Sequence, residues 1–200
     1  MKIALTGGIA CGKSTLAKFL TELGIRVLDA DDVVHELEAP GGAAVEDIRA
    51  RFGDDVVDAC GGIDRARLAS VVFFDGTARR ALEDLLFPRV RRMLLDFVGS
   101  APRGEIRVAV IPLLFESHWD GDYDTIVAIA SPAALQIERM MRTRGYTREQ
   151  AQARLAAQMP VAEKAARADF AVVNDSTPVQ LQEQARRLVA WLKERTNHEH

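Results

Sequence analysis

The chain has 200 residues, of which 48% are hydrophobic and 28% are charged, a balance typical of a folded globular protein rather than a disordered one. Its length accommodates one α/β core with modest insertions and excludes two large independent domains. The formal net charge of −3 argues against a non-specific nucleic-acid binder. We see no secretory signal and no apolar run near the ~20 residues of a membrane span, so we expect a cytoplasmic protein without membrane or nucleic-acid partners.

The first thirty residues have the pattern strand, loop, helix, strand. Residues 2–6 are typical of a short buried strand, and a glycine-rich turn follows at 7–12. Residues 13–23 have helical spacing of apolar side chains, and Gly24 is expected to end that helix. A second strand is predicted at 25–28, parallel to the first.

Residues 31–100 carry no strong strand pattern. A stretch of this length far exceeds what a crossover between two parallel strands requires. We therefore interpret it as a helical insertion, with ordinary crossover packing as the alternative. Its expected helices cover 32–37, 45–52, 64–72 and 78–98, the last interrupted near Pro88.

The second half of the chain alternates strands with helices, which predicts an α/β fold with a three-layer core and a five-stranded parallel sheet. The expected strands are 106–111, 125–130 and 170–173, and the expected helices are 132–144, 147–159 and 178–193.

Residues 7–15 read GGIACGKST and satisfy the phosphate-loop pattern GxxxxGK[ST] between a strand and a helix. Glycines let the backbone curl until its N–H groups face phosphate oxygens, and the following helix adds the positive end of its dipole. Lys13 is expected to reach the β- and γ-phosphates of ATP, and Ser14 to bind Mg²⁺. A glycine turn without a ligand is the alternative. The predicted nucleotide-binding residues here are Gly7, Gly8, Ala10, Cys11, Gly12, Lys13, Ser14 and Thr15.

Two carboxylates follow the second strand. Asp29 and Asp31 are two residues apart on an extended chain, so both side chains could face the phosphate loop at the carboxyl end of the sheet. One could accept a proton from an attacking hydroxyl, and either could hold water on Mg²⁺. Alternatively, Asp31 is only the N-cap of a helix beginning at Asp32. His35 follows Asp31 by four residues and is expected to be a polar partner on the same helix face.

A segment rich in arginine lies between the fourth and fifth strands. Arg139 and Arg142 share a helical face, and Gly145 offers a hinge. Cations on a mobile lid can neutralise the charge that develops on a transferred phosphate. The alternative is a solvated helix whose arginines pair with Glu138 and Glu149. The cations of this segment are Arg139, Arg142, Arg144, Arg148, Arg154 and Lys164.

Several motifs together resemble the dephospho-coenzyme A kinase family along nearly the whole chain. The phosphate loop alone is shared with thousands of proteins, whereas the combination is much more specific. The segments that carry the resemblance are LTGGI at 5–9 with GKST at 12–15, DAD at 29–31 with His35, PLLFE at 112–116, Gln158, Lys164, Ala168-Asp169 and Asn174.

The resemblance implies transfer of the γ-phosphate of ATP to the ribose 3′-hydroxyl of dephospho-CoA, with Mg²⁺, by a monomer or weak homo-oligomer. It implies a nucleotide-binding core at 1–30, 101–138 and 165–200, a helical acceptor-substrate insertion at 31–100, and a lid at 139–164. Asp31, as the base, Lys13 and Arg139 are then the predicted catalytic residues. Arg142 and Asn174 are predicted to bind the nucleotide, Asn174 near the adenine. The predicted acceptor site comprises Asp29, His35, Arg91, Leu113, Leu114 and Glu116.

The sequence departs from the family pattern at three places. Ala10 and Cys11 stand where many members have Gly and Ser. Phe87-Pro88 replaces a frequent His-Pro, while Arg91 is kept. Thr143 occupies the usual position of a lid arginine, and either Arg142 or Arg144 could substitute.

Two rival functions stay open from the residues alone. One is another small P-loop kinase that acts on a nucleoside, a nucleotide or a sugar acid. The other is a nucleotide-hydrolysing switch protein, although the guanine-specificity pattern NKxD of many switches is absent.

Cys11 also permits two interpretations. The following helix and Lys13 would lower the pKa of its thiol and make it reactive toward alkylators. Alternatively, its sulfur points inward and is inert.

Overall fold

The computed structural model describes residues 1–198, and the chain divides into two compact units. The first contains Met1–Leu28 and the described residues from Phe97 onward, and the second contains Asp29–Asp96. Residues 199 and 200, which the sequence analysis assigns to the nucleotide-binding core, lie outside the described residues. No helix in the described part of the chain combines the length and apolar character needed to span a membrane.

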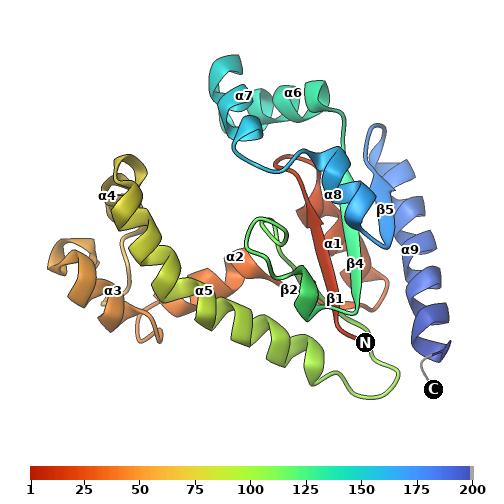
Figure 1. The fold of residues 1–200 in the computed structure, drawn as a ribbon, viewed down its shortest axis with the longest axis horizontal. Coiled ribbons are helices and arrows are strands. Elements are labelled where there is room, and N and C mark those ends of the chain that lie inside the picture. Colours follow the sequence, from red (N-terminus) through yellow and green to blue (C-terminus); the bar gives the residue numbers. More distant parts are fainter. Residues whose placement is uncertain (199–200) are drawn as a thin grey trace. The chain divides into compact units, whose positions relative to one another are not determined.

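A five-stranded parallel sheet forms the centre of the first unit, which confirms the predicted fold class (Figure 1). Its strand order is β2-β3-β1-β4-β5, so β1 lies in the middle, where Leu5 pairs with Val110 on one side and Val127 on the other. The burial of β1 on both faces explains its apolar run at Ile3, Ala4 and Leu5. The strands are β1 (Ile3–Gly7), β2 (Arg26–Asp29), β3 (Arg107–Val110), β4 (Thr125–Ala130) and β5 (Phe170–Val173).

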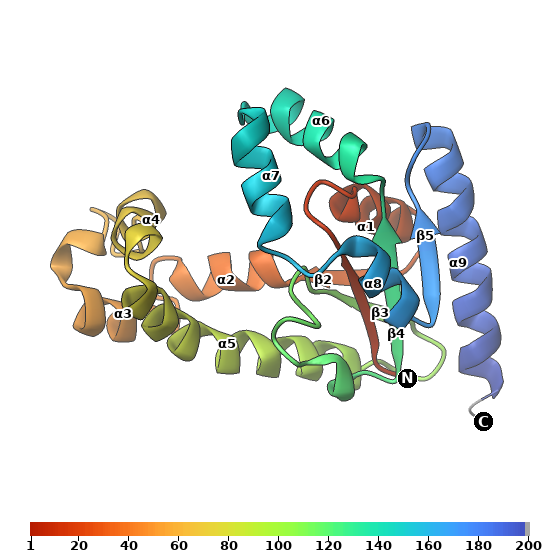
Figure 2. The ribbon, with the colours of Figure 1, turned by 45° about the horizontal axis from the view of Figure 1, so that its top comes forward.

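Helices cover both faces of this sheet and give the three layers. Helices α1 (Lys13–Glu22) and α9 (Pro178–His198) pack together on one face, and α8 (Val161–Arg167) packs against β4 and β1 on the other. Helices α6 (Ala133–Arg144) and α7 (Arg148–Ala156) lie side by side, as Figure 2 shows. Leu16 and Leu20 of α1 join Leu188 of α9 in the main apolar core beneath the sheet.

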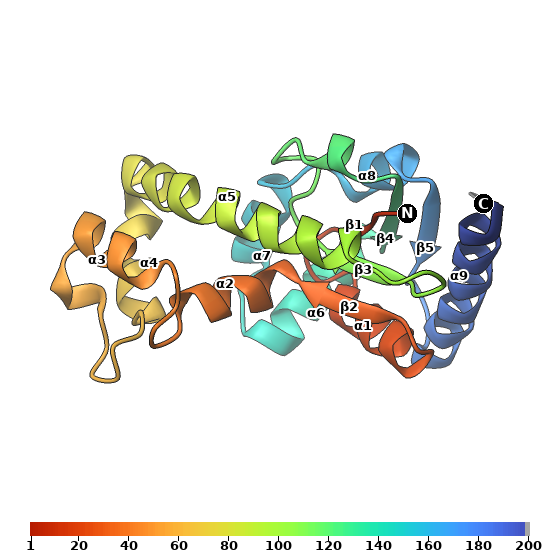
Figure 3. The same ribbon diagram turned by 90° about the horizontal axis from the view of Figure 1, so that it is seen from below.

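The second unit is helical. Its elements, with the α-helices labelled in Figure 3, are α2 (Ala30–Glu38), α3 (Val45–Phe52), a short 3-10 turn at Asp54–Val56, α4 (Arg65–Phe74) and the 24-residue α5 (Gly76–Gly99), of which residues 97–99 belong to the first unit. Asp64 caps α4 through its carboxylate, which accepts hydrogen bonds from the N–H groups of Ala66 and Arg67.

Two helices, α5 and α8, differ from what the sequence predicted. Helix α5 continues across Pro88, where the sequence predicted an interruption. Leu86, Val90 and Leu94 are buried at four-residue spacing, so packing of this one face outweighs the hydrogen bond that proline cannot donate. Helix α8 was not predicted at all, because its only buried side chain is that of Lys164.

Candidate active site

The predicted phosphate loop connects the carboxyl end of β1 to the amino end of α1. Gly12 adopts a left-handed backbone with φ of 93°, and a Cβ at this position would collide with the side chain of Asn174. Ala10 is also left-handed, with φ of 57°, although it has a Cβ. Such a conformation costs a non-glycine residue on the order of 1 kcal/mol and persists only where neighbouring contacts enforce it. The position where many members of the resembled family have glycine therefore needs glycine-like geometry here.

Donors from several elements hold the carbonyl oxygens of this loop from Gly7 to Cys11. The donor and acceptor pairs are Lys13 Nζ with Gly7 and Gly8 (both 2.9 Å), Gln136 Nε2 with Ile9 (2.6 Å), an Arg139 guanidinium nitrogen with Ala10 (3.3 Å) and Asn174 Nδ2 with Cys11 (2.8 Å). The N–H groups of Ile9 and Cys11 are bonded within the protein, to Gln158 Oε1 and to the Gly8 carbonyl, so the N–H groups that the loop can offer a ligand belong to its other residues. The first turn of α1 adds further N–H groups that have no intrahelical partner. This arrangement fits a phosphate chain.

Arg139 lies against this loop. Besides Ala10, its guanidinium donates to the Ser131 hydroxyl at 3.0 Å and to the Asn174 carbonyl at 3.2 Å. Ser131 in turn donates to the Asn174 carbonyl at 2.6 Å. In this structure Arg139 and Asn174 thus hold the loop through its carbonyl oxygens at Ala10 and Cys11. Their predicted contacts to the transferred phosphate and to adenine stay predictions.

Other residues of the predicted lid are exposed. Arg142 is 69% exposed and forms an ion pair with Glu138 at 3.8 Å, one of the pairings that the sequence allowed. Gly145 ends α6 in a left-handed conformation with φ of 65°. Thr147 and Gln150 then form a capping box that starts α7. The choice between Arg142 and Arg144 as the lid cation stays open.

The expectation of a reactive Cys11 is wrong. Its side chain is buried in the apolar core with Leu16 and Leu20. Burial raises the pKa of the Cys11 thiol, and this effect exceeds the opposing influence of the Lys13 ammonium. The inert alternative therefore holds, and Cys11 contributes its backbone to the loop while its sulfur fills the core.

The turn that follows β3 is held by a buried ion pair. Lys164 has a fully buried side chain and lies 2.7 Å from Glu116 Oε1, and its Nζ donates to the Pro112 carbonyl at 2.8 Å. The Met159 N–H also donates to Glu116, at 3.0 Å. Of the two leucines predicted to line the acceptor site, Leu114 is fully buried. Leu113 and Glu116 are partly exposed and stay candidates.

The predicted acceptor residues of the second unit lie on two helices. Asp29, and not Asp31, is the N-cap of α2: its carboxylate accepts a hydrogen bond from the Asp31 N–H at 2.9 Å. The helix begins at Ala30, two residues earlier than expected, because the carboxylate that can satisfy the first turn is that of Asp29. Asp31 and His35 lie one turn apart on α2, and Arg91 lies on α5.

The described residues contain no group of three or more His, Cys, Asp or Glu side chains placed to hold a metal ion. Mg²⁺ in kinases is commonly bound by one or two protein groups together with substrate phosphates rather than by a dedicated protein cage. Ser14, in the first turn of α1, provides a hydroxyl of the kind required, so the loop fits this ion.

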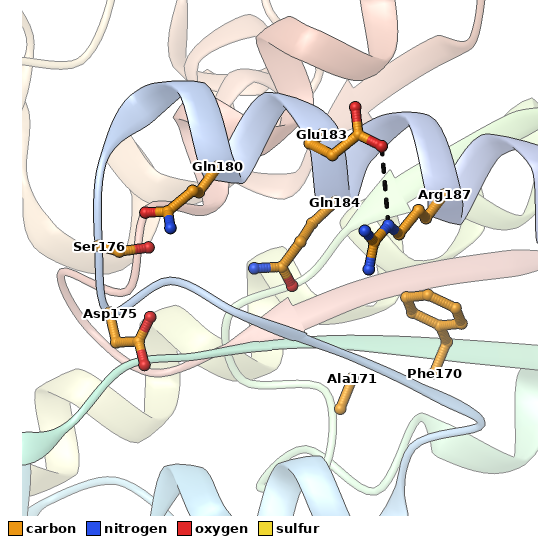
Figure 4. Close-up of a pocket in the computed structure, with 8 residues that line it drawn as sticks. All are labelled: Phe170, Ala171, Asp175, Ser176, Gln180, Glu183, Gln184 and Arg187. Carbon is orange, nitrogen blue, oxygen red and sulfur yellow. Dashed lines mark ion pairs between the residues drawn. The ribbon is translucent and has the colours of Figure 1, made fainter.

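A separate hollow of about 450 Å³ lies between β5 and α9 (Figure 4). The Gln184 amide spans the edge of the sheet there and accepts a hydrogen bond from the Val173 N–H at 2.9 Å. Glu183 and Arg187 form an ion pair across one side of it. The hollow is lined by Phe170, Ala171, Asp175, Ser176, Gln180, Glu183, Gln184 and Arg187, and the Asn174 side chain points instead to the phosphate loop.

Comparison with known proteins identifies the family. The model of the dephospho-CoA kinase family matches residues 1–180. The chain belongs to the dephospho-CoA kinase family. It is 38% identical to a dephospho-CoA kinase of Geobacillus kaustophilus over 196 residues, 97% of this chain and 96% of the relative. It is 41% identical to one of Aromatoleum aromaticum over 189 residues, which cover 94% and 92% of the two chains.

Solved structures share the fold. A crystal structure of a Thermus thermophilus protein has a TM-score of 0.79 and 33% identity and covers 96% of this chain and 97% of its own. The dephospho-CoA kinase of Campylobacter jejuni has a TM-score of 0.66 at 24% identity, covering 94% and 96%, and supports the fold. A shikimate kinase of Acinetobacter baumannii shares the fold with a TM-score of 0.54 at 14% identity, covering 97% and 93%.

Proposed function

We propose that this kinase transfers the γ-phosphate of ATP to the ribose 3′-hydroxyl of dephospho-CoA, yielding CoA and ADP. The observation that carries the proposal is the phosphate loop, whose carbonyls are bonded to surrounding donors so that N–H groups other than those of Ile9 and Cys11 can face phosphate. Membership of the family indicates that the acceptor is dephospho-CoA, since the relatives are dephospho-CoA kinases. Another small P-loop kinase or a switch protein is not favoured by these relatives.

The proposed roles divide along the chain. The segments 1–30, 101–138 and 165–200 bind ATP, 31–100 binds the acceptor, and 139–164 acts as the lid. In this assignment Lys13 and the loop N–H groups hold the β- and γ-phosphates, and Arg139 faces the charge that develops on the transferred group. Mg²⁺, when bound beside Ser14, supplies further neutralisation of phosphate charge.

Asp31 is the proposed base. Its carboxylate would accept the proton of the ribose 3′-hydroxyl as that oxygen bonds to phosphorus. Asp29 would orient the first turn of α2, and with it Asp31, because it caps this helix. His35, Arg91, Leu113 and Glu116 are proposed to contact the acceptor, and the fully buried Leu114 is proposed to support this site from the core. We further propose a cytoplasmic monomer or weak homo-oligomer.

A product assay tests the function. Purified protein is incubated with MgATP and dephospho-CoA, and CoA formation is followed by mass spectrometry. Parallel reactions contain shikimate, gluconate, a nucleoside or no acceptor. Among these acceptors, we expect only dephospho-CoA to be phosphorylated rapidly. Without an acceptor, hydrolysis of ATP should be very slow. Lys13→Ala should keep its circular dichroism spectrum and lose at least ~3 kcal/mol of transition-state stabilisation, which is more than about 100-fold in kcat/KM. Faster turnover of another acceptor, or wild-type activity of Lys13→Ala, would overturn the proposal.

A further inference from the structure

Two glutamine side chains form hydrogen bonds with the two backbone polar groups of one phosphate-loop residue, Ile9. We call this pair of hydrogen bonds the grip. The Ile9 N–H donates to Gln158 Oε1 at 3.0 Å, and the Ile9 carbonyl accepts from Gln136 Nε2 at 2.6 Å. Gln136 lies on α6 and Gln158 follows α7, about 130 and 150 residues away in the sequence. Neither residue belongs to the phosphate-loop motif.

The orientation of the Gln136 amide is fixed by this contact. The reverse orientation would place the amide oxygen 2.6 Å from the Ile9 carbonyl oxygen, where two acceptors repel each other. The whole side chain is buried, so water cannot replace the bond without moving α6. A buried acceptor left without a donor costs about 1–3 kcal/mol, which makes the Ile9 contact costly to break.

Gly8 leaves the space for this grip. A Cβ on Gly8 would lie 2.6 Å from Gln136 Nε2 and 3.4 Å from the Val161 side chain of α8. The close approach of Gln136 on α6 to the loop therefore depends on a glycine whose φ is not itself unusual.

Gln158 is itself held in place by its neighbour. The next residue, Met159, donates its N–H to Glu116, whose carboxylate is paired with the buried Lys164. Gln158, which contacts the loop, is thus adjacent in sequence to Met159, which is bonded to the turn after β3. This anchor leaves Gln158 little freedom to follow a displaced loop.

The grip determines which way the peptide groups of the loop point. A peptide group is planar, so fixing the Ile9 N–H fixes the Gly8 carbonyl, and fixing the Ile9 carbonyl fixes the Ala10 N–H. The Ala10 N–H is one of the loop groups that face phosphate in the proposed function, and the Gly8 carbonyl accepts a hydrogen bond from the Lys13 ammonium. We propose that Gln136 and Gln158 are positioning residues that hold the phosphate loop in its anion-binding conformation.

Nucleotide binding tests the proposal without the phosphoryl acceptor. Isothermal titration calorimetry measures the dissociation constant of MgADP for wild type, Gln136→Met, Gln158→Met and the double variant. Methionine has similar length and no comparable hydrogen-bonding group. Gln152→Met, on the exposed side of α7, is the matched control. We expect each loop variant to weaken MgADP binding at least about fivefold and to raise the KM for MgATP in step.

The double variant distinguishes a shared grip from two separate effects. Once one contact is lost, Ile9 is already free to turn, so the combined loss should be well below the product of the two single losses. A role in folding alone would lower the active fraction and leave the KM for MgATP unchanged. If Gln136→Met does not fold, Gln158→Met decides the matter by itself.

Three results would overturn the proposal: single variants that bind MgADP within twofold of wild type, an equal loss in Gln152→Met, or losses that multiply fully. The inference rests on the proposed nucleotide-binding role of the loop, but not on the acceptor. A protein that binds MgADP and fails to phosphorylate dephospho-CoA would refute the proposed reaction and leave this test intact.

Discussion

Replacing Lys164 by methionine should destabilise the first unit strongly. Methionine keeps most of the length of the side chain and removes its charge and its hydrogen bonds to Pro112 and Glu116. Breaking a buried ion pair by removing one partner costs about 3–5 kcal/mol. Glu116 is 23% exposed and keeps the hydrogen bond from Met159, so part of its charge is still solvated and the lower end applies. We expect a loss of about 3 kcal/mol, which for a domain of this size lowers Tm by roughly 6–12 °C.

Tryptophan fluorescence during urea unfolding measures this loss. Both tryptophans, Trp119 and Trp191, lie in the first unit, so the signal reports the unit that contains the ion pair. The free energy of unfolding follows from the midpoint and the slope of the transition. The exposed pair of Arg186 and Glu183 on α9 provides the control, since Arg186→Met should cost no more than about 1 kcal/mol.

A second substitution shows whether the unpaired charge is the cause. Adding Glu116→Gln to Lys164→Met removes the stranded carboxylate and keeps an acceptor for the Met159 N–H. We expect the double variant to regain at least half of the lost stability, because replacing both members of a buried pair is much less costly than removing one. Two results would refute this explanation. One is a free energy of unfolding of Lys164→Met within about 1 kcal/mol of wild type, well below the loss expected for a broken buried pair. The other is a double variant that is no more stable than the single one.

Three further expectations concern the other unit and the cysteines. Asp31→Asn should lower kcat with dephospho-CoA by roughly 100-fold with little change in ATP affinity, whereas Asp29→Asn, which keeps a capping side chain, should cost little; steady-state kinetics that rank Asp29→Asn as the worse variant would exchange the two roles. Burial raises the pKa of Glu38 in the folded state, so its contribution to stability is present below the ordinary glutamate pKa and is lost as pH rises through the raised value. Urea unfolding followed by circular dichroism at pH 4.5 and pH 8 should therefore show a pH-dependent loss that Glu38→Gln reduces, and an equal pH dependence in that variant would contradict this origin. An alkylating reagent should label Cys60 in the native protein and reach Cys11 only after unfolding, since Cys60 is exposed and Cys11 is buried; equal labelling in mass mapping would show that the loop opens readily.

Much of the fold is determined locally and can be predicted from the sequence. The phosphate loop combines a strand, glycines at fixed spacing and a helix within about twenty residues, so its presence can be predicted from a short stretch of sequence. The same is true of β4 and β5, whose predicted bounds agree with the structure. Apolar runs of four to six residues between turn-forming residues define such strands without information from the rest of the chain, although β4 is buried along most of its length and β5 only at Val172.

What the sequence left undecided depends on contacts between distant residues. Gln136, Gln158 and Asn174 reach the phosphate loop from more than a hundred residues away, and no local pattern marks a glutamine or asparagine whose partner is a distant backbone group. Cys11 shows the same limit, because charge along the sequence suggested a low pKa and burial among core side chains raised it instead.

Helix α8 is the sharpest case. Its sequence, VAEKAAR, has no apolar stripe of the kind that reveals an amphipathic helix, since the side chain that it buries is that of a lysine. A buried ammonium is tolerated only where other polar groups replace its hydration water. Here the Glu116 carboxylate and the Pro112 carbonyl do so, and they lie 48 and 52 residues away in the sequence. The sequence by itself therefore determined the elements whose stability comes from apolar periodicity, and the tertiary structure alone decided which polar groups could be taken out of water.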